Sequence, residues 1–343
     1  MSGEEALVRS IRDRVAAATG ADAGVRVGIG DDCAVLEPRP GAALLATTDM
    51  LIENVHFRRR WAQPGDVGWK AMAVNLSDIA AMGGRPRWAL FALGFPEGTD
   101  ASEVEAFYEG ALALARSHEV TIVGGDTSAS PAGWVVNVTL LGDALPLRLR
   151  STARIGDVVA VTGALGAAAA GLALLERGAA PSALASEHRD EVIRAHLRPR
   201  PRVPEGRWLV SAGGVTAMMD LSDGLGIDLP RLLAASGVGA AIDVDRVPIH
   251  EAARATGAAL GVDPAAWATS GGEDYELLLT CEPQALGRLQ QGLRDVCGTA
   301  LTPIGEVIEG AGEVRWSAAG RPVTVARGFE HFVTPPVARG AGA

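Results

Sequence analysis

Strand-like and helix-like segments alternate along this chain, and the alternation restricts the fold to the α/β and α+β classes. In the first half we expect helices over residues 4–19, 66–82 and Ala101–Ser117, and strands near Val35 and over Ala43–Thr47, Trp88–Phe95, Thr121–Val123 and Trp134–Leu141. In the second half we expect strands over 157–162, 240–244, 276–280, 303–308 and 313–316, with helices after the GALG turn at 163–166 and near 249–260 and 283–293.

The length of 343 residues suggests two domains, at roughly 150 residues per domain. A polar, arginine-bearing connector at 143–156 interrupts the pattern between them. We therefore predict an N-terminal mixed-sheet α/β domain over 1–146, a C-terminal α+β domain over 147–335 and a flexible tail over 336–343. The segment HLRPRPRVPEG, 196–206, reads as a surface loop before a further helix.

The charge balance excludes some functions. Lys and Arg number 31 against 41 Asp and Glu, which gives a net charge of -10 and argues against binding nucleic acid or an anionic membrane by bulk positive field. A protein this acidic needs metal ions to bind phosphates. Lys70 is the single lysine, and its surroundings, GDVGWKAM, do not form a P-loop, so P-loop kinases are excluded.

The three cysteines, Cys33, Cys281 and Cys297, lie far apart and lack the spacing of a disulfide framework or a zinc site. The N-terminal segment is charged and helical in pattern, unlike a signal peptide. Glycines interrupt the most apolar stretch, Val158–Leu175, so we predict no membrane span. These features favour the cytoplasm.

Six short acidic motifs carry the strongest functional signal. Each places Asp or Glu beside Gly, Ser or Thr, where we expect a strand to end or a helix to begin. They are GIGDDCA (28–34), TTDM (47–50), NLSD (75–78), VGGDT (123–127), DLSDG (220–224) and SGGED (270–274). One such motif is an ordinary turn or helix cap, but six predict a shared cleft. Clustered carboxylates without His or Cys favour Mg²⁺. Because substrate phosphates commonly complete the coordination of this ion, the motifs indicate a nucleotide site.

Two motifs suggest how phosphate is bound. In DLSDG, a helix beginning near Ser222 would place Asp220 and Asp223 around one point and leave the N–H groups of that turn for a phosphate oxygen. The glycines of VGGDT would let the backbone approach a phosphate closely. NLSD resembles DLSDG, with an Asp after a Ser at a helix start, which duplication or helix capping explains equally well. We attribute the GALG turn to close packing rather than to phosphate binding.

Outside these motifs, His56 follows an apolar strand and is a candidate substrate contact, and Arg150 on the connector is a candidate phosphate contact. Taken alone, each is more simply a surface residue. The chain has no G-x-S-x-G elbow, no H-E-x-x-H motif, no protein-kinase signature and no dinucleotide fingerprint. Covalent acyl chemistry and hydride transfer therefore have no support.

The segments GIGDDCAVL, TTDMLIENVHF, KAMAVNLSDIAAMG, IVGGDT, DLSDGL and SGGEDYEL, in this order, resemble thiamine-monophosphate kinases. The resemblance extends from about residue 26 to GFEHF at 328–332, within the aminoimidazole ribonucleotide synthetase-like superfamily. It implies that superfamily's fold, a homodimer paired through the N-terminal domains, and an ATP site of acidic loops holding several Mg²⁺ ions.

The resemblance also assigns roles to residues of this chain. It implies metal ligands at Asp32, Thr47, Thr48, Asp49, Asp78, Asp126, Asp220 and Asp223, with Asp31 as a neighbour. It implies ATP contacts at Gly125, Asp126, Arg150 and Ser222. It implies thiamine phosphate contacts at His56, Glu273 and Phe329. Asp49 and Asp220 would act in catalysis through the metal, and no residue would act as a covalent nucleophile.

The reaction implied is direct in-line transfer of the γ-phosphoryl group of ATP to thiamine monophosphate, which gives thiamine diphosphate. The acceptor phosphate, with a second pKa near ~6, is already ionised at pH 7 and needs no strong general base. Selenophosphate synthetase and the hydrogenase-maturation dehydratase differ by reactive terminal cysteines, while purine-pathway relatives are disfavoured by NVHF and SGGEDYE. A non-catalytic metal-binding or nucleotide-sensing module is the alternative from another class.

Overall fold

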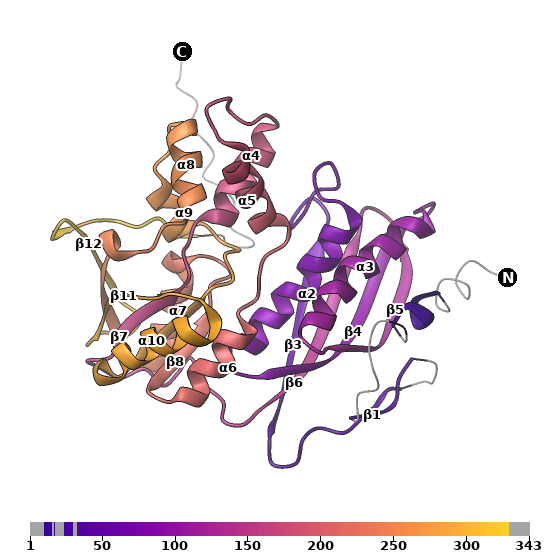
Figure 1. Ribbon diagram of the computed structural model, residues 1–343, viewed down its shortest axis with the longest axis horizontal. Helices are drawn as coiled ribbons and strands as arrows, with labels where there is room; N and C mark the ends of the chain where they lie inside the picture. The colour runs from indigo at the N-terminus through magenta and orange to yellow at the C-terminus, as the bar shows by residue number, and fades with distance from the viewer. Residues whose placement is uncertain (1–9, 16, 18–23, 30–32, 329–343) are drawn as a thin grey trace.

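Two separate β-sheets divide the protein into two units that lie side by side (Figure 1). The computed structural model describes residues 10–15, 17, 24–29 and 33–328. The predicted metal ligand Asp32, its neighbour Asp31, the predicted substrate contact Phe329 and the tail over 336–343 lie outside the described residues. Within the helix expected over 4–19, the described residues 10–15 and 17 are helical.

The N-terminal sheet has four strands in the order β3-β6-β4-β5. Their bounds are β3 Ala43–Ile52, β4 Arg85–Pro96, β5 Thr121–Ser130 and β6 Val135–Ala144. Strands β4 and β5 are parallel and the other pairs are antiparallel, so the sheet is mixed as predicted. A short hairpin, β1 Val25–Val27 with β2 Val35–Leu36, precedes it.

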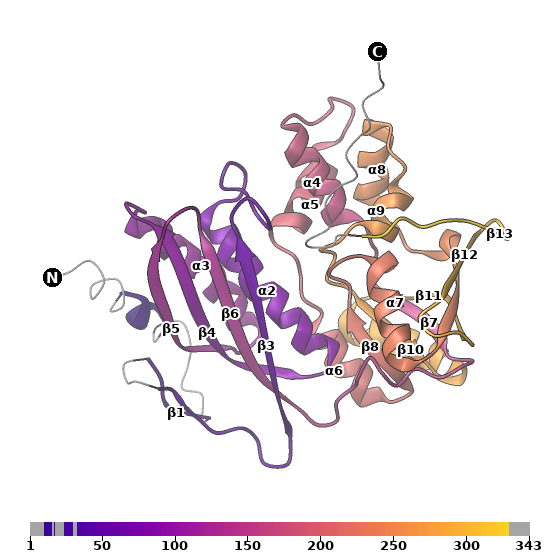
Figure 2. The same ribbon diagram turned by 180° about the vertical axis from the view of Figure 1, so that it is seen from behind.

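Helices α2, Pro64–Ala81, and α3, Ala101–Ser117, cover one face of this sheet. Phe91 of β4 meets Phe107 of α3 edge to face, with ring centroids 6.1 Å apart, in a core that excludes water from both layers. The opposite face carries no helix among the described residues, and Figure 2 shows its strands uncovered. Leu44 and Met50 of β3 are 56% and 49% exposed there. This uncovered face, which also carries the polar Thr48 and Asn137, is called the open face below.

The C-terminal sheet has seven strands in the order β13-β12-β9-β11-β7-β10-β8, of which only β12 and β9 pair in parallel. The strands are β7 Val158–Thr162, β8 Val215–Asp220, β9 Gly239–Asp243, β10 Leu277–Cys281, β11 Leu301–Ile308, β12 Val314–Ala318 and β13 Arg321–Pro322. The helices are α4 Ala167–Arg177, α5 Ser186–Leu197, α6 Val203–Ala212, α7 Leu225–Ser236, α8 Glu251–Leu260, α9 Pro264–Ser270 and α10 Leu286–Cys297, with short 3₁₀ turns η1 Val244–Arg246 and η2 Pro283–Ala285.

This architecture confirms the predicted two-domain α/β and α+β fold class. The last strand of the first sheet ends at Ala144 and the first strand of the second begins at Val158, so we propose the domain boundary within the connector between them. None of the described helices is long and apolar enough to cross a membrane.

Several local predictions were wrong. NLSD does not open a helix, because α2 begins at Pro64 and carries Asp78 in its last turn. TTDM and VGGDT lie inside strands rather than after them, since β3 and β5 are each ten residues long. Helices α5 and α9 were not anticipated.

The segment HLRPRPRVPEG is not a surface loop but packs between the domains. The indole Nε1 of Trp69 on α2 donates to the Pro199 carbonyl at 2.9 Å, and Arg198 pairs with Asp66 at 2.6 Å. Arg202 pairs with the buried Glu276. Two of the three arginines that made this segment look solvated, Arg198 and Arg202, are therefore partners of acidic residues elsewhere in the fold, whereas Arg200 is exposed.

Candidate active site

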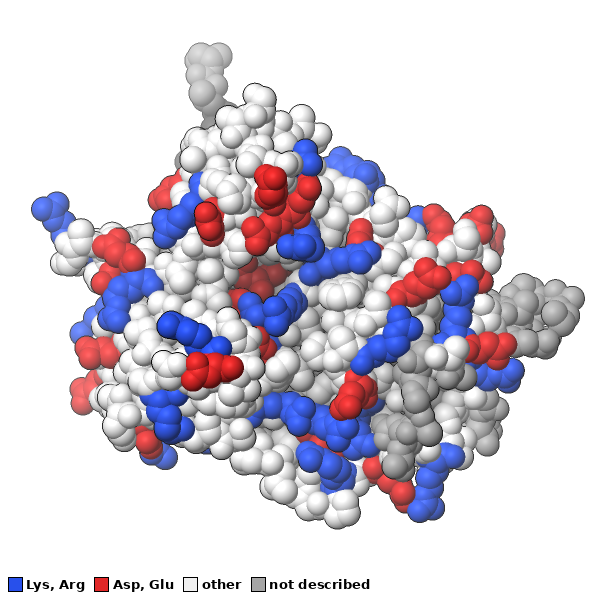
Figure 3. Space-filling view, viewed as in Figure 1, with Lys and Arg blue, Asp and Glu red and all other residues white. Residues whose placement is uncertain are grey.

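A cleft of about 790 Å³ lies between the two domains. Strand β3, the turn after it and α2 form one wall, and α4, α5 and the loops around residues 222 and 272 form the other. In Figure 3, acidic atoms are visible within a hollow between the two halves of the molecule. The cleft has an acidic end and an end lined by apolar and aromatic side chains.

Four predicted metal ligands, Asp49, Asp78, Asp220 and Asp223, line the acidic end. Hydrogen bonds hold two of them, Asp78 and Asp220, and Arg231 pairs with Asp223. Ser77 Oγ on α2 donates to Asp220 Oδ2 at 2.7 Å, across the domain junction, and Thr47 Oγ1 on β3 donates to the carboxylate of Asp78. The structure therefore brings carboxylates from β3, α2 and the end of β8 to one place, although they lie far apart in the sequence.

The acidic end is short of positive charge. Burial, together with the charges of Asp78, Asp228 and Asp49, raises the pKa of Asp220 to about 8, against the hydrogen bond from Ser77. Burial and the charges of Asp78 and Asp223 raise the pKa of Asp49 to about 6. Burial also raises the pKa of Asp78, although its bond from Thr47 and the charge of Arg150 oppose this. A cation placed here would relieve these shifts.

The donor set fits a hard divalent cation, because it consists of carboxylate and hydroxyl oxygens. Among the described residues, however, no three Asp, Glu, His or Cys side chains converge closely enough to form a complete metal site. A magnesium ion here would therefore be bound by one or two carboxylates, with water and substrate oxygens completing its shell, as is usual for this ion.

The loop after β8 differs from the sequence-based expectation. Asp228 Oδ2 accepts the N–H groups of Ser222, Asp223 and Gly224 at 3.0, 2.9 and 3.0 Å. The expectation that these N–H groups are available for phosphate was wrong, because this buried carboxylate already binds them. Helix α7 begins at Leu225, and Asp228 in its first turn holds the loop in shape. An acidic residue shortly after a Ser-Asp-Gly turn is the signal that could have revealed this role.

A carboxylate also accepts backbone N–H groups at the GALG turn. Asp274 Oδ2 accepts the N–H of Gly166 at 2.7 Å, and its Oδ1 accepts the N–H of Ala168 at 3.3 Å. The interpretation of this turn as a feature of close packing is confirmed, since a Cβ on Gly163 would lie 2.1 Å from Glu276 Oε1 and one on Gly166 would lie 3.0 Å from the Ala268 nitrogen.

Glu273 stands in the cleft wall between two basic groups that the sequence analysis missed. Lys70 Nζ lies 2.7 Å from its Oε1, and His196 Nδ1 lies 3.0 Å from its Oε2. Burial acts to raise the pKa of Glu273, but Lys70 and His196 outweigh it and lower the pKa to about 2. Lys70 is buried on α2 of the N-terminal domain and Glu273 belongs to the C-terminal domain, so this ion pair also crosses the domain junction. A lone lysine within the apolar run of α2 was the available signal.

The backbone at this position is strained, which supports a functional role. Glu273 has φ 68° and Tyr275 has φ 50°, both in the left-handed region that non-glycine residues seldom adopt. The contacts with Lys70 and His196 hold the carboxylate of Glu273 in the cleft wall, which Tyr275 also lines.

His56 lies in the turn after β3 and lines the cleft, together with Trp61, Leu172 and Trp267. Its Nδ1 accepts the N–H of Ile52 at 3.0 Å, which fixes the ring. In the neutral form, Nε2 then carries the proton. This end of the cleft suits a ligand with flat rings, whereas the acidic end suits metal-bound phosphates.

Other predicted site residues lie elsewhere. Arg150 is exposed on the connector and acts on Asp78 through its charge. Thr48 lies on the open face, where it bonds with Asn137. Gly125 and Asp126 lie on β5, separated from β3 by two strands. A Cβ on Gly125 would come within 2.1 Å of the Phe91 carbonyl oxygen, so pairing with β4 already requires glycine here.

The chain matches two family models: AIR synthase related protein, N-terminal domain, over residues 30–144, and its C-terminal domain over 154–317. Thiamine-monophosphate kinase of Salmonella typhimurium is 39% identical over 340 residues, covering 97% of this chain and 99% of that protein. The Bacillus subtilis enzyme is 40% identical over 269 residues, covering 78% and 81%. The chain belongs to the thiamine-monophosphate kinase family.

Solved structures agree with this assignment. The thiamine-monophosphate kinase of Stenotrophomonas maltophilia superposes with a TM-score of 0.81 at 37% identity, covering 92% of this chain and 97% of that one. AaThiL complexed with AMPPCP and TMP superposes with a TM-score of 0.75 at 34% identity, covering 96% and 97%. The hydrogenase maturation protein HypE of E. coli, at 21% identity and a TM-score of 0.73, shares the fold alone.

Proposed function

We propose that this protein transfers the γ-phosphoryl group of ATP to thiamine monophosphate and releases thiamine diphosphate and ADP. The observation that carries this proposal is the cleft itself, in which a buried carboxylate cluster faces a wall of aromatic and apolar side chains. The AaThiL complex with AMPPCP and TMP, at 34% identity over nearly the whole chain, supports the same pair of substrates here.

The acidic end would hold the triphosphate. Asp49, Asp78 and Asp220 would bind Mg²⁺, which, when bound, screens the repulsion between the two anionic substrates and stabilises charge on the transferred group. The residues themselves supply position: Ser77 fixes Asp220, Thr47 fixes Asp78, and Asp228 fixes the loop that carries Ser222. The exposed Arg150, whose charge acts on Asp78, would contact phosphate oxygens from the connector.

The other end would hold the acceptor. His56 and Glu273 would supply polar contacts beside Trp267, whose ring would offer a flat apolar surface to the rings of thiamine monophosphate. Trp61 at the same end already contacts the guanidinium groups of Arg58 and Arg60. Lys70 and His196 keep Glu273 ionised and oriented, so we assign them as positioning residues. Direct transfer needs no general base, because the acceptor phosphate is already ionised at neutral pH.

We also infer a homodimer. The open face exposes Leu44, Met50 and Ile52 of β3 beside Thr48, and a second copy could cover it, although Met50 also lines the cleft. Asp126 lies in the same cross-strand row as Met50 and therefore on the open face. Asp49 precedes Met50 in β3 and so points to the opposite, helix-covered face. Three strand spacings separate β5 from β3, about 14 Å. Asp126 and Gly125 would therefore serve the cleft of the second copy rather than their own.

We also propose a cytoplasmic location, with which the free thiols of Cys33, Cys281 and Cys297 are consistent. The function is tested by turnover with ATP, Mg²⁺ and thiamine monophosphate, following ADP and thiamine diphosphate together. Equal formation of both products, abolished by EDTA, is the expected result. ADP without thiamine diphosphate would contradict the assigned acceptor, and free thiamine serves as the control substrate.

A further inference from the structure

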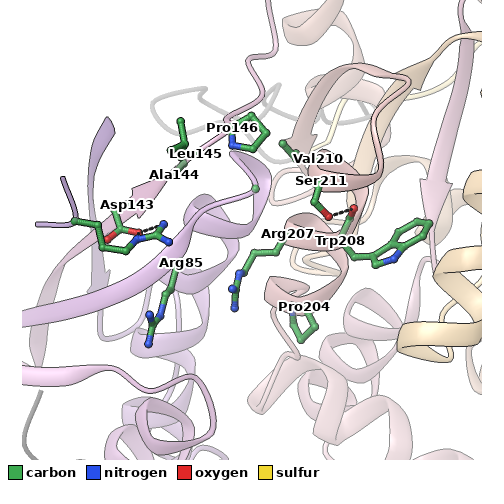
Figure 4. Close-up of a pocket in the computed structure, with 12 residues that line it drawn as sticks. Arg85, Asp143, Ala144, Leu145, Pro146, Pro204, Arg207, Trp208, Val210 and Ser211 are labelled. Atoms are coloured by element: carbon green, nitrogen blue, oxygen red, sulfur yellow. Dashed lines mark hydrogen bonds and ion pairs between the residues drawn. The ribbon is translucent and has the colours of Figure 1, made fainter. Parts of the chain in front are cut away.

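A second pocket, of about 400 Å³, lies at the domain junction away from the cleft. Its wall from the N-terminal domain comes from the turn before β3, the start of β4 and the end of β6, and its other wall is α6. In Figure 4, Arg85 of β4 and Arg207 of α6 extend into the space between the two domains. The volume is within the range of small-ligand sites, roughly 300–1,000 Å³.

The lining is basic in a protein whose net charge is -10. Arg39, Arg85 and Arg207 contribute three positive charges, against the single carboxylate of Asp143. Figure 3 shows basic residues gathered on this side of the molecule, near α6 and β6. Such a local excess of arginine costs electrostatic repulsion unless an anion neutralises it.

The arginines are held in different ways. Asp143 is fully buried and accepts from Arg39 Nε at 2.8 Å and from Arg87 Nη1 at 3.2 Å, so the carboxylate fixes Arg39 and is fully used. Arg85 pairs at the rim with the exposed Glu119, at 3.0 Å. Arg207 has no ion-pair partner among the residues that the structure describes. One guanidinium is therefore preorganised and a second is available.

We propose that this pocket binds a small phosphorylated molecule, held by Arg39, Arg85 and Arg207. The planar guanidinium donates paired hydrogen bonds in a geometry that matches phosphate, and three of them suit a ligand with two or more negative charges. Leu145 and Pro146 form an apolar lip beside the arginines, which suits an organic phosphate better than a bare ion.

Helix α2 connects the pocket to the cleft, which it lines with Val74 and Asp78. Gly83, in the turn that ends α2, lines the pocket and packs against Val210 of α6 so closely that a Cβ would lie 2.4 Å from its Cγ2. Asp78 stands in the last turn of the same helix. An anion bound between Arg85 and Arg207 would bridge the same two domains that the Ser77–Asp220 hydrogen bond joins.

The two anion sites differ in their need for metal, and the test uses this difference. Without metal the cleft presents carboxylates and repels phosphates, whereas the arginine pocket binds them directly. Calorimetric titrations in EDTA, at fixed ionic strength, use pyrophosphate and ADP as probes. We expect a Kd below about 1 mM for at least one probe. Tighter binding of ADP identifies an organic phosphate as the ligand, and tighter binding of pyrophosphate identifies an inorganic one.

The variant Arg85→Ala/Arg207→Ala should weaken this binding at least tenfold. Both residues lie outside the cleft, so the variant leaves the lining of the cleft unchanged. The matched control is Arg246→Ala/Arg315→Ala, which removes two exposed arginines from η1 and β12 and should leave the Kd unchanged. Thermal unfolding shows whether each variant is folded. Absence of metal-independent binding in the wild type, or equal binding by the pocket variant, would overturn the proposal.

Discussion

Replacing Asp220 by Asn should stabilise the metal-free protein while abolishing turnover. The carboxyl of Asp220 has a pKa of about 8 in the folded protein, against 3.8 for an ordinary aspartate, chiefly because it is buried. The folded state thus retains a proton that the unfolded chain releases, and stability falls as pH rises between these two values. The full difference corresponds to about 6 kcal/mol, of which about 5 kcal/mol is reached at pH 8.

The amide should recover only part of this energy. The amide oxygen can keep the hydrogen bond from Ser77. However, part of the electrostatic cost in the folded protein arises from Asp49 and Asp78, which remain charged in the variant. We therefore expect about 3 kcal/mol at pH 8, or a Tm increase of roughly 3–6 °C. Because the cause is an ionised carboxylate, the advantage of the variant should shrink towards pH 5.

The assay is thermal unfolding in EDTA between pH 5 and 8, repeated with Mg²⁺. Magnesium should raise the Tm of the wild type and not that of Asp220→Asn, since binding to the folded state alone stabilises it. Asp295→Asn, on the exposed side of α10, is the matched control and should change Tm by less than about 1 °C. A lower Tm for Asp220→Asn than for the wild type at pH 8 would refute the reasoning.

Three further predictions test the site. Lys70→Met should raise the KM for thiamine monophosphate at least tenfold with little change in the KM for ATP, and Lys70→Arg should partly restore it; a change confined to stability would remove Lys70 from the positioning role. His56→Ala should mainly weaken acceptor binding, and steady-state kinetics with both KM and kcat unchanged would exclude it from the site. Asp126→Asn and Asp220→Asn should each be inactive, yet a mixture of exchanged subunits should recover about a quarter of wild-type turnover, because half of the dimers would contain one intact cleft. Continued inactivity of mixed dimers, verified by mass spectrometry, would place Asp126 in its own subunit's cleft.

The cleft shows where reasoning from sequence succeeded. Asp49, Asp78, Asp220 and Asp223 could be recognised because each stands beside small residues within a short motif, and the structure brings all four together. His56 and Glu273 line the same cleft. The contacts with bound substrates and metals that the resemblance assigns to them remain predictions.

The partners of backbone donors could not be predicted in the same way. Ser222 and Gly166 both begin segments that resemble phosphate-binding turns, yet Asp228 and Asp274 already accept their N–H groups. In one case the acceptor lies six residues away, and in the other it lies on a loop 108 residues later. Only the second separation is too long for a local sequence pattern to indicate the partner.

The sequence by itself determined the alternation of strands and helices, the fold class and the family, because side-chain periodicity and short motifs are local properties. The tertiary structure decided which motifs share a site. Asp49 and Asp126 belong to one sheet, but strand order places them at opposite edges and the period of two places them on opposite faces. Likewise, a single buried lysine on α2 became the partner of Glu273 only because the two domains pack against each other.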